Sequence, residues 1–302
     1  MKRREFLVGA AAAFSLAHGR RGLAQARDAA KLNRVAIMSL CFNSILKTPG
    51  ADAAGRTLEI MDLGQMLADK YGVHNVEMQH AHFPSTDAKS LKDFRDRLAA
   101  SKSRVTNINL EFGPVNISAD DSGMRQQAVQ RTQQWIDYAA ALGCPRIMVN
   151  QGQPNEVNKP LAIAALKAMS EYGKSKKVMV AMENRGGGGG GRPGAPAPPP
   201  PNPAAWVLLV EIMKGAGAYA NCDLGNFPDQ ATQHAGIRGM LPLTDGNCHV
   251  KLNPQRYDLP AALKLVKELK YTGLYSIEAG GNMGPDPHQN VQAIYDVLLA
   301  NI

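Results

Sequence analysis

The sequence lacks several features that would assign it to a large class of proteins. Its N-terminal apolar stretch, residues 8–17, is too short to cross a bilayer as a permanent anchor. The six-glycine run at 186–191 is not completed by the Lys-Ser/Thr pair of a P-loop, so it is not that type of phosphate cradle. The first predicted strand, residues 34–40, is not followed by a dinucleotide-type glycine fingerprint, which argues against a doubly wound fold.

Positive charge is also scarcer than the whole composition indicates. Residues 1–26 carry Lys2-Arg3-Arg4, then Phe6-Leu7, the apolar stretch and an Ala24-Gln25-Ala26 cleavage site, which resembles a twin-arginine export signal. Its removal leaves 29 basic and 25 acidic residues, so the net charge falls from +8 to +4. This small excess gives little support for a nucleic-acid partner, and we expect none. We expect an exported periplasmic or extracellular protein; a basic cytoplasmic tail is the weaker alternative.

What the sequence does contain is a repeated alternation of strand and helix patterns. Strand-like runs occur at 34–40, 75–78, 105–110, 146–150 and 178–183, and three more lead to Asp223, His249 and Glu278. Eight strand–helix units predict a single α/β domain over residues 27–302, a (βα)₈ TIM barrel. The Gly/Pro-rich segment 186–203 is predicted to be a low-complexity insertion, or a lid segment, in the loop after the fifth strand.

Four of the predicted strands end in a residue that can bind a metal ion. In chain order these residues are Glu183, Asp223, His249 and Glu278. The C-terminal strand ends are where a closed α/β barrel assembles its chemistry. Three carboxylates and one imidazole suit one divalent ion, Mn²⁺, Mg²⁺, Co²⁺ or Zn²⁺, and the oxygen-rich set favours the harder ions. Cys222 and Cys248 precede two of these ligands, so strand alternation turns them toward the helix layer, and buried thiols are favoured over a disulfide.

Further polar residues near the predicted strand ends are candidates for substrate contact. They include Glu77, His80, Asn150 and Lys251. Lys251 lies two residues after His249 on the same strand face, so its ammonium can reach the lumen. The alternative for Lys251 is an ordinary lysine at the barrel rim. The alternative for His80 is a surface histidine in a loop. Arg185 is either a clamp for a phosphate or carboxylate, or an ordinary surface side chain.

The runs 182–184, 222–227, 248–251 and 271–278 resemble the xylose-isomerase-like TIM-barrel superfamily, whose members are usually labelled sugar phosphate isomerases/epimerases. The resemblance implies that Glu183 and Glu278 both bind the metal and act as an acid/base pair, with Asp223 and His249 as the other ligands. Two positions depart from the ketose epimerases of this superfamily and are included among the substrate-binding candidates. Asn226 stands where those enzymes have a histidine, and only Arg256 could replace their substrate-clamping arginine.

The resemblance implies a divalent-metal-dependent isomerase or epimerase that acts on a sugar or keto-sugar through an enediolate. A metal-dependent lyase or dehydratase of a keto-sugar or 3-keto-glycoside is the alternative, followed by a non-catalytic sugar-binding barrel. An AP-endonuclease is disfavoured, because Asn226 replaces a histidine that its metal cluster would need. We expect a small carbohydrate as the partner, and a homo-oligomer remains open.

Overall fold

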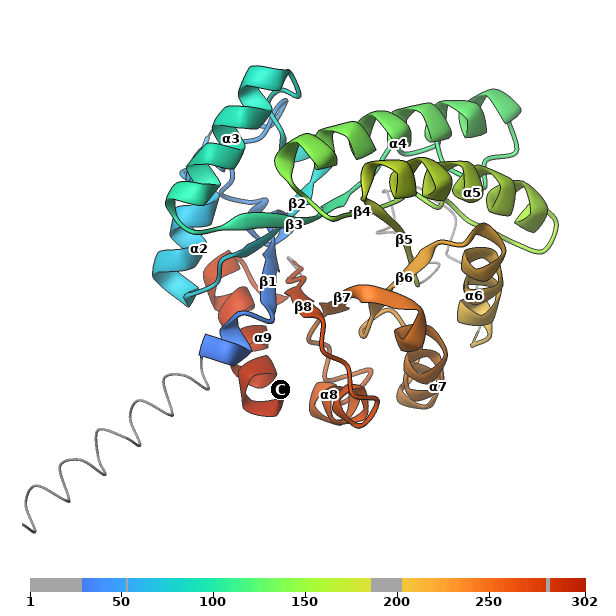
Figure 1. The fold of residues 1–302 in the computed structure, drawn as a ribbon. Coiled ribbons are helices and arrows are strands. Elements are labelled where there is room, and N and C mark those ends of the chain that lie inside the picture. Colours follow the sequence, from blue (N-terminus) through green and yellow to red (C-terminus); the bar gives the residue numbers. More distant parts are fainter. Residues whose placement is uncertain (1–28, 53, 186–202, 281–282) are drawn as a thin grey trace, which may run out of the picture.

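The computed structural model describes residues 29–302 except 53, 186–202 and 281–282. Within this range, eight parallel strands form a closed barrel in the order β1 to β8, and helices surround it (Figure 1). The predicted fold class, a single (βα)₈ TIM barrel, is confirmed. The predicted signal peptide lies outside the described residues, and so does the predicted insertion except for Pro203.

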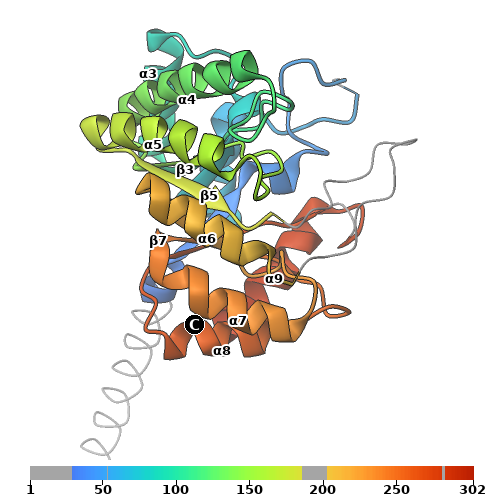
Figure 2. The same cartoon turned by 90° about the vertical axis from the view of Figure 1, so that its right-hand side faces the viewer.

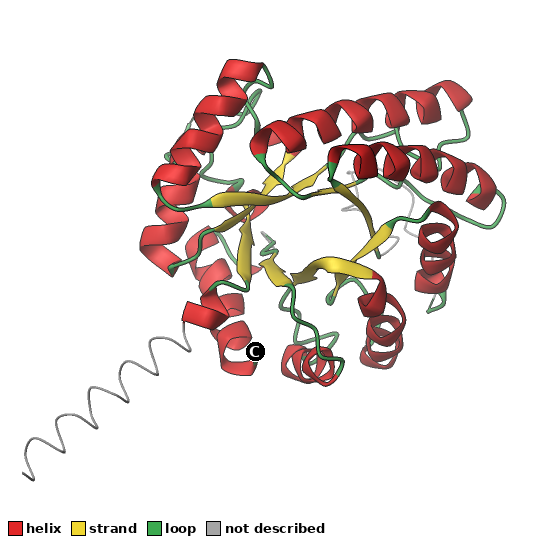
Figure 3. Cartoon of the chain, in the orientation of Figure 1, coloured by secondary structure: helices red, strands yellow, loops and turns green. Residues whose placement is uncertain are grey.

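Strands and helices alternate along the chain (Figure 3). The strands are β1 Val35–Met38, β2 Asn75–Gln79, β3 Arg104–Asn109, β4 Arg146–Met148, β5 Met179–Glu183, β6 Tyr219–Asp223, β7 Thr244–Val250 and β8 Leu274–Ile277. The helices are α2 Leu63–Tyr71, α3 Ala88–Ala100, α4 Ser122–Leu142, α5 Lys159–Lys176, α6 Ala205–Ala216, α7 Gln230–Met240, α8 Leu259–Glu268 and α9 Pro287–Asn301.

Helix ends follow the capping residues of the sequence. The Asp87 carboxylate accepts a hydrogen bond from the Ser90 backbone N–H at 2.9 Å, and this begins α3. Asp121 accepts from the Met124 N–H at 2.7 Å and begins α4. Gly143 ends α4 with a φ of 70°, a left-handed conformation that suits glycine.

The main hydrophobic core lies between the barrel wall and the helices, which pack side by side around it (Figure 2). The barrel closes through parallel pairing of β1 with β8, where Ala36 is the register partner of Ser276. Closure brings inward-facing residues of the first four strands into the same lumen as those of the last four. No helix in the described part of the chain combines the length and apolar character needed to cross a membrane.

Candidate functional site

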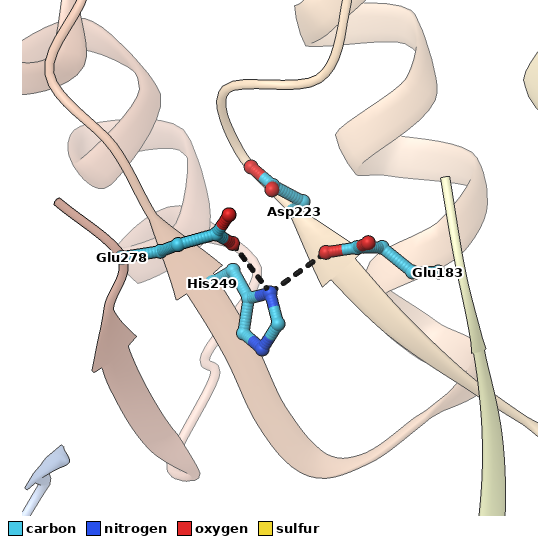
Figure 4. A group of neighbouring side chains, drawn as sticks. All are labelled: Glu183, Asp223, His249 and Glu278. Atoms are coloured by element: carbon cyan, nitrogen blue, oxygen red, sulfur yellow. Dashed lines mark hydrogen bonds and ion pairs between the residues drawn. The ribbon is translucent and has the colours of Figure 1, made fainter. Parts of the chain in front are cut away.

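Four side chains that could hold a metal ion converge at the C-terminal ends of β5 to β8 (Figure 4). Glu183 ends β5, Asp223 ends β6, His249 lies near the end of β7, and Glu278 directly follows β8. One donor atom from each residue lies within 4.8 Å of the others. Donors that share one divalent ion at about 2.0–2.6 Å span a similar distance. The donor set therefore fits a single ion.

The ring of His249 is held with its Nδ1 atom toward the acidic residues. Nδ1 lies 2.7 Å from Oε1 of Glu183 and 3.1 Å from Oε2 of Glu278, which approach it from opposite sides (Figure 4). Asp223 is the register partner of His249 on the neighbouring strand, so the backbones of these two residues are locked together. Nδ1 is thus the ring nitrogen that could bind a metal ion.

Glu77 lies on the opposite edge of the same imidazole. Its Oε1 atom is 2.6 Å from Nε2 of His249, and both side chains are fully buried. This position corrects the expectation that Glu77 contacts substrate. The sequence pattern ends the second strand at residue 78, whereas β2 continues to Gln79, so Glu77 lies in mid-strand below the mouth of the barrel.

The buried charges in this group stabilise one another. Burial raises the pKa of Glu77, but the charge and hydrogen bond of His249 outweigh burial and lower it to about 2. Burial lowers the pKa of His249, but Glu77 and Glu183 raise it well above its ordinary value. Burial raises the pKa of Asp223, and the neighbouring Lys251 only partly opposes this. Before a metal binds, the imidazole is therefore held as a cation between carboxylates.

Lys251 reaches into the site, as its strand position predicts. Its Nζ atom lies 2.8 Å from Oδ2 of Asp223 and 3.0 Å from Oε1 of Glu278. It also donates a hydrogen bond to Oδ1 of Asn226 at 3.1 Å. Burial lowers the pKa of Lys251, but these carboxylates raise it overall, so the side chain remains an ammonium. Lys251 and Asn226 both line the cavity above the four candidate ligands.

Arg185 is engaged by acidic residues of the protein itself. Its Nε atom donates to Oε2 of Glu183 at 3.0 Å, and its guanidinium also pairs with Glu111. Burial lowers the pKa of Arg185, but the two carboxylates raise it overall. Arg185 thus restrains the Glu183 oxygen that does not face His249.

A cavity of about 1230 Å³ opens above the cluster. Glu183, His249 and Glu278 form part of its lining, so a bound molecule could touch the candidate ligands. The described lining residues include only two cationic side chains besides His249, namely Arg185 and Lys251, and both are paired with carboxylates.

Asn150 and Arg256 lie apart from this cavity, unlike their expected positions. The Asn150 amide donates to the backbone carbonyls of Gly113 at 2.9 Å and Val115 at 3.3 Å. It therefore fastens the loop after β3 and lies two residues beyond the end of β4 at Met148. Arg256 is exposed in the loop after β7, and neither residue is among the described lining residues.

His80 is likewise occupied by protein contacts. It begins a short 3₁₀ helix, and its Nδ1 atom accepts a hydrogen bond from the Glu111 backbone N–H at 3.1 Å. Its ring packs edge-on against Phe112 and Trp135, and burial lowers its pKa. The structure therefore places His80 in an aromatic cluster beside the site.

Two amide side chains hold the ligands in place and were not among the expected site residues. Asn184 accepts a hydrogen bond from the Asp223 backbone N–H at 2.7 Å and donates to its carbonyl oxygen at 2.9 Å. Gln151 accepts from the Glu183 N–H at 3.1 Å and lines the cavity. The sequence signal was an amide residue directly after a predicted strand end: Asn184 follows Glu183, and Gln151 follows Asn150.

Comparison with known proteins supports the architecture. A family model described as xylose isomerase-like TIM barrel matches residues 66–196, less than half of the chain. No curated protein matches this chain.

Solved structures with the same fold are similar over most of their length. A xylose isomerase-like TIM barrel protein from Mycobacterium smegmatis in complex with magnesium is 15% identical, with a TM-score of 0.60, over 90% of this chain and 98% of that one. D-Psicose 3-epimerase with D-tagatose from Clostridium cellulolyticum H10 is 12% identical, with a TM-score of 0.62, over 89% and 95%. The probable 3-DHS dehydratase involved in petrobactin synthesis from Bacillus anthracis is 11% identical, with a TM-score of 0.62, over 88% and 98%. At these identities the likeness shows the shared barrel fold, and over residues 66–196 the chain resembles the xylose isomerase-like TIM barrel family.

Proposed function

We propose that this protein is a divalent-metal-dependent isomerase or epimerase that acts on a sugar or keto-sugar through an enediolate. The observation that carries the proposal is the arrangement of Glu183 and Glu278. Their carboxylates approach Nδ1 of His249 from opposite sides, at 2.7 and 3.1 Å, in the lining of one cavity. Two carboxylates so placed can serve the two faces of one substrate carbon.

Glu183, Asp223, His249 and Glu278 would hold the ion, which would polarise the carbonyl of an α-hydroxyketone and lower the pKa of the adjacent C–H. One glutamate can then remove that proton, and the other can return a proton to the opposite face. Arg185 binds Oε2 of Glu183, which leaves Oε1 directed at the centre of the site. Lys251 contacts Glu278 and so lies where it could stabilise charge that develops on a substrate oxygen.

The charge of the site favours a neutral carbohydrate. A phosphate group would need a cation that is available to it, but Arg185 and Lys251 are each shared between two carboxylates. Of the other glutamates in the described lining, Glu111 shares Arg185 with Glu183, and Glu156 and Glu211 share Lys159, so carboxylates still outnumber the cations that pair with them. The D-tagatose-bound epimerase and the magnesium-bound barrel protein supply precedents in this fold for a sugar and a hard ion.

A metal-dependent lyase is the second candidate. Elimination begins with the same proton removal, but it then needs an acid to protonate a leaving oxygen. The ammonium of Lys251, 3.0 Å from Glu278, is a proton-bearing group at the right depth for that role. The probable dehydratase among the similar structures supports this second candidate. We also propose export through the twin-arginine signal at residues 1–26, on the sequence pattern alone.

The experiment that tests the proposal is proton exchange in deuterated water. The full chain, loaded with Mn²⁺, is incubated with a panel of neutral ketoses, and the sugars are analysed by NMR and mass spectrometry. We expect deuterium at the carbon next to the carbonyl, together with an epimer, an isomer or a dehydrated product that separates the two candidates. Chelator-treated protein is the control. Turnover without deuterium uptake and without transfer of label within the substrate would rule out proton abstraction and favour hydrolysis.

A further inference from the structure

We propose that Glu77 is a positioning residue whose carboxylate fixes the ring of His249, so that Nδ1 faces the other candidate ligands. The inference rests on the proposed metal centre and adds a residue from the opposite half of the barrel. The side chain of Glu77 points into the barrel from β2. Since β2 is far from β7 in sequence, Glu77 meets His249 only because the barrel is closed.

The first support is the geometry around the imidazole. Nε2 of His249 lies 2.6 Å from Oε1 of Glu77, while Nδ1 lies 2.7 Å from Oε1 of Glu183. The two ring nitrogens therefore have separate partners on opposite edges of the ring. An ionised carboxylate only accepts hydrogen bonds, so the proton on Nε2 is held in place and Nδ1 is the atom left to bind a cation.

The second support is that Glu77 is itself held rigidly. Asn109 donates from Nδ2 to Oε1 of Glu77 at 2.7 Å, and Asn247 donates from Nδ2 to Oε2 at 3.2 Å. Each amide is oriented in turn, because Asn109 accepts from Asn107 at 3.1 Å and Asn247 donates to Asn221 at 2.9 Å. The carboxylate thus has partners on both oxygens and cannot turn away from the imidazole.

Burial separates this role from direct catalysis. Glu77 is fully buried on the far edge of the His249 ring and, unlike His249, is not among the described lining residues of the cavity. A buried carboxylate is costly unless it is paired and hydrogen-bonded. An ordinary core position would be filled better by an apolar residue, whereas a carboxylate here secures the orientation of one histidine.

The test compares E77L and E77Q with wild type. Leu removes the acceptor at similar volume, and Gln keeps one acceptor oxygen but removes the charge. The matched control is T106V on β3, because Thr106 is also buried and, among the described contacts, its hydroxyl bonds only the Val76 carbonyl, at 3.3 Å. Each chelator-stripped full-length protein is titrated with Co²⁺ by absorption and with Mn²⁺ by EPR, and thermal unfolding checks the fold.

We expect E77L to bind Co²⁺ about 10- to 100-fold more weakly, with an altered d–d spectrum, as for the loss of other outer partners of metal-binding histidines. E77Q should show a smaller loss of the same kind, and T106V should match wild type. In the metal-free wild type, NMR should show a hydrogen-bonded Nε2–H of His249, and that signal should shift in both Glu77 variants.

Wild-type affinity and an unchanged Co²⁺ spectrum in folded E77L would overturn the proposal. If E77L does not fold, wild-type affinity and an unshifted Nε2–H signal in E77Q would overturn it instead. If the wild type binds neither ion, the proposed metal-dependent function fails. The NMR signal still decides whether Glu77 orients His249: a shift in E77Q supports the role, and no shift overturns it.

Discussion

The ammonium of Lys251 lies 2.8 Å from Oδ2 of Asp223 and so competes for a carboxylate that could bind a metal ion. We expect K251M to bind Mn²⁺ about tenfold more tightly, a change on the scale of one charge-assisted hydrogen bond. Turnover should nevertheless fall, because the group proposed to stabilise charge on the substrate is lost. Chelator competition gives the affinity and steady-state kinetics gives kcat.

K89M is the control for K251M, since Lys89 is an exposed lysine that pairs only with Asp93 among the described salt bridges. Its Mn²⁺ affinity and kcat should equal those of the wild type. Weaker Mn²⁺ binding in K251M would show that Lys251 organises the carboxylates instead of competing for them.

If Glu183 and Glu278 form an acid/base pair, replacing either one should reduce kcat more than it reduces metal affinity. E183Q and E278Q should each reduce kcat by about 10²- to 10⁴-fold, because an amide cannot exchange the proton. The amide oxygen can still bind a metal, so Mn²⁺ affinity should fall much less than kcat. E156Q, at the rim of the cavity, should retain wild-type kinetics. Equal losses of affinity and turnover would show that these residues serve only as ligands.

Metal binding should release a proton at neutral pH. The neighbouring carboxylates raise the pKa of His249 well above 6.5, so the ring is protonated in the metal-free protein and must lose a proton from Nδ1. Affinity should therefore rise with pH by about tenfold per unit until the raised pKa is passed. Glu77, with a pKa of about 2, stays ionised throughout this range and does not contribute.

Calorimetry in buffers of different ionisation enthalpy measures this release directly. About one proton per Mn²⁺ is expected at pH 7, and binding heats that do not depend on the buffer would contradict it. The dependence should weaken in H249N, which has no imidazole to deprotonate.

Asn184 should contribute to both stability and metal affinity. N184A leaves the buried N–H and C=O of Asp223 without their side-chain partners, at about 1–3 kcal/mol for each group. We expect the free energy of unfolding to fall by about 2–4 kcal/mol in urea titrations, and Mn²⁺ affinity to fall with it. N184D keeps an acceptor for the N–H but sets a buried carboxylate oxygen against the Asp223 carbonyl, so it should lose at least as much stability. Unchanged stability in N184A would show that water replaces both hydrogen bonds.

Phosphorylated substrates should be poor ones, because both cavity cations are already paired. We expect kcat/KM for a neutral ketose to exceed that for its phosphate ester, and inorganic phosphate to inhibit weakly. Comparison of the two sugars under the same metal loading checks this. A preference for the ester would require Arg185 to leave Glu183 when substrate binds.

The sequence was more informative about the barrel and its candidate ligands than about how far below the barrel mouth the other polar side chains lie. Period-2 alternation places Glu183 and Asp223 correctly at the last residues of β5 and β6. The same alternation turns Glu77 inward but does not show that β2 continues to Gln79. Asn150 was misplaced for a related reason, since the pattern extended the fourth strand two residues beyond Met148. Which backbone carbonyls an amide meets after a strand ends depends on neighbouring loops, and these are set by tertiary packing.

The four candidate ligands come from β5 to β8, whereas Glu77 comes from β2. If the chain were cut in the loop between β4 and β5, one fragment would carry all four donors without the carboxylate that orients His249. Such a fragment should bind metal weakly by itself and gain affinity when the N-terminal fragment is added. Metal affinity would then report reassembly of the two halves, and E77L in the N-terminal fragment would abolish the gain without touching the fragment that binds the ion.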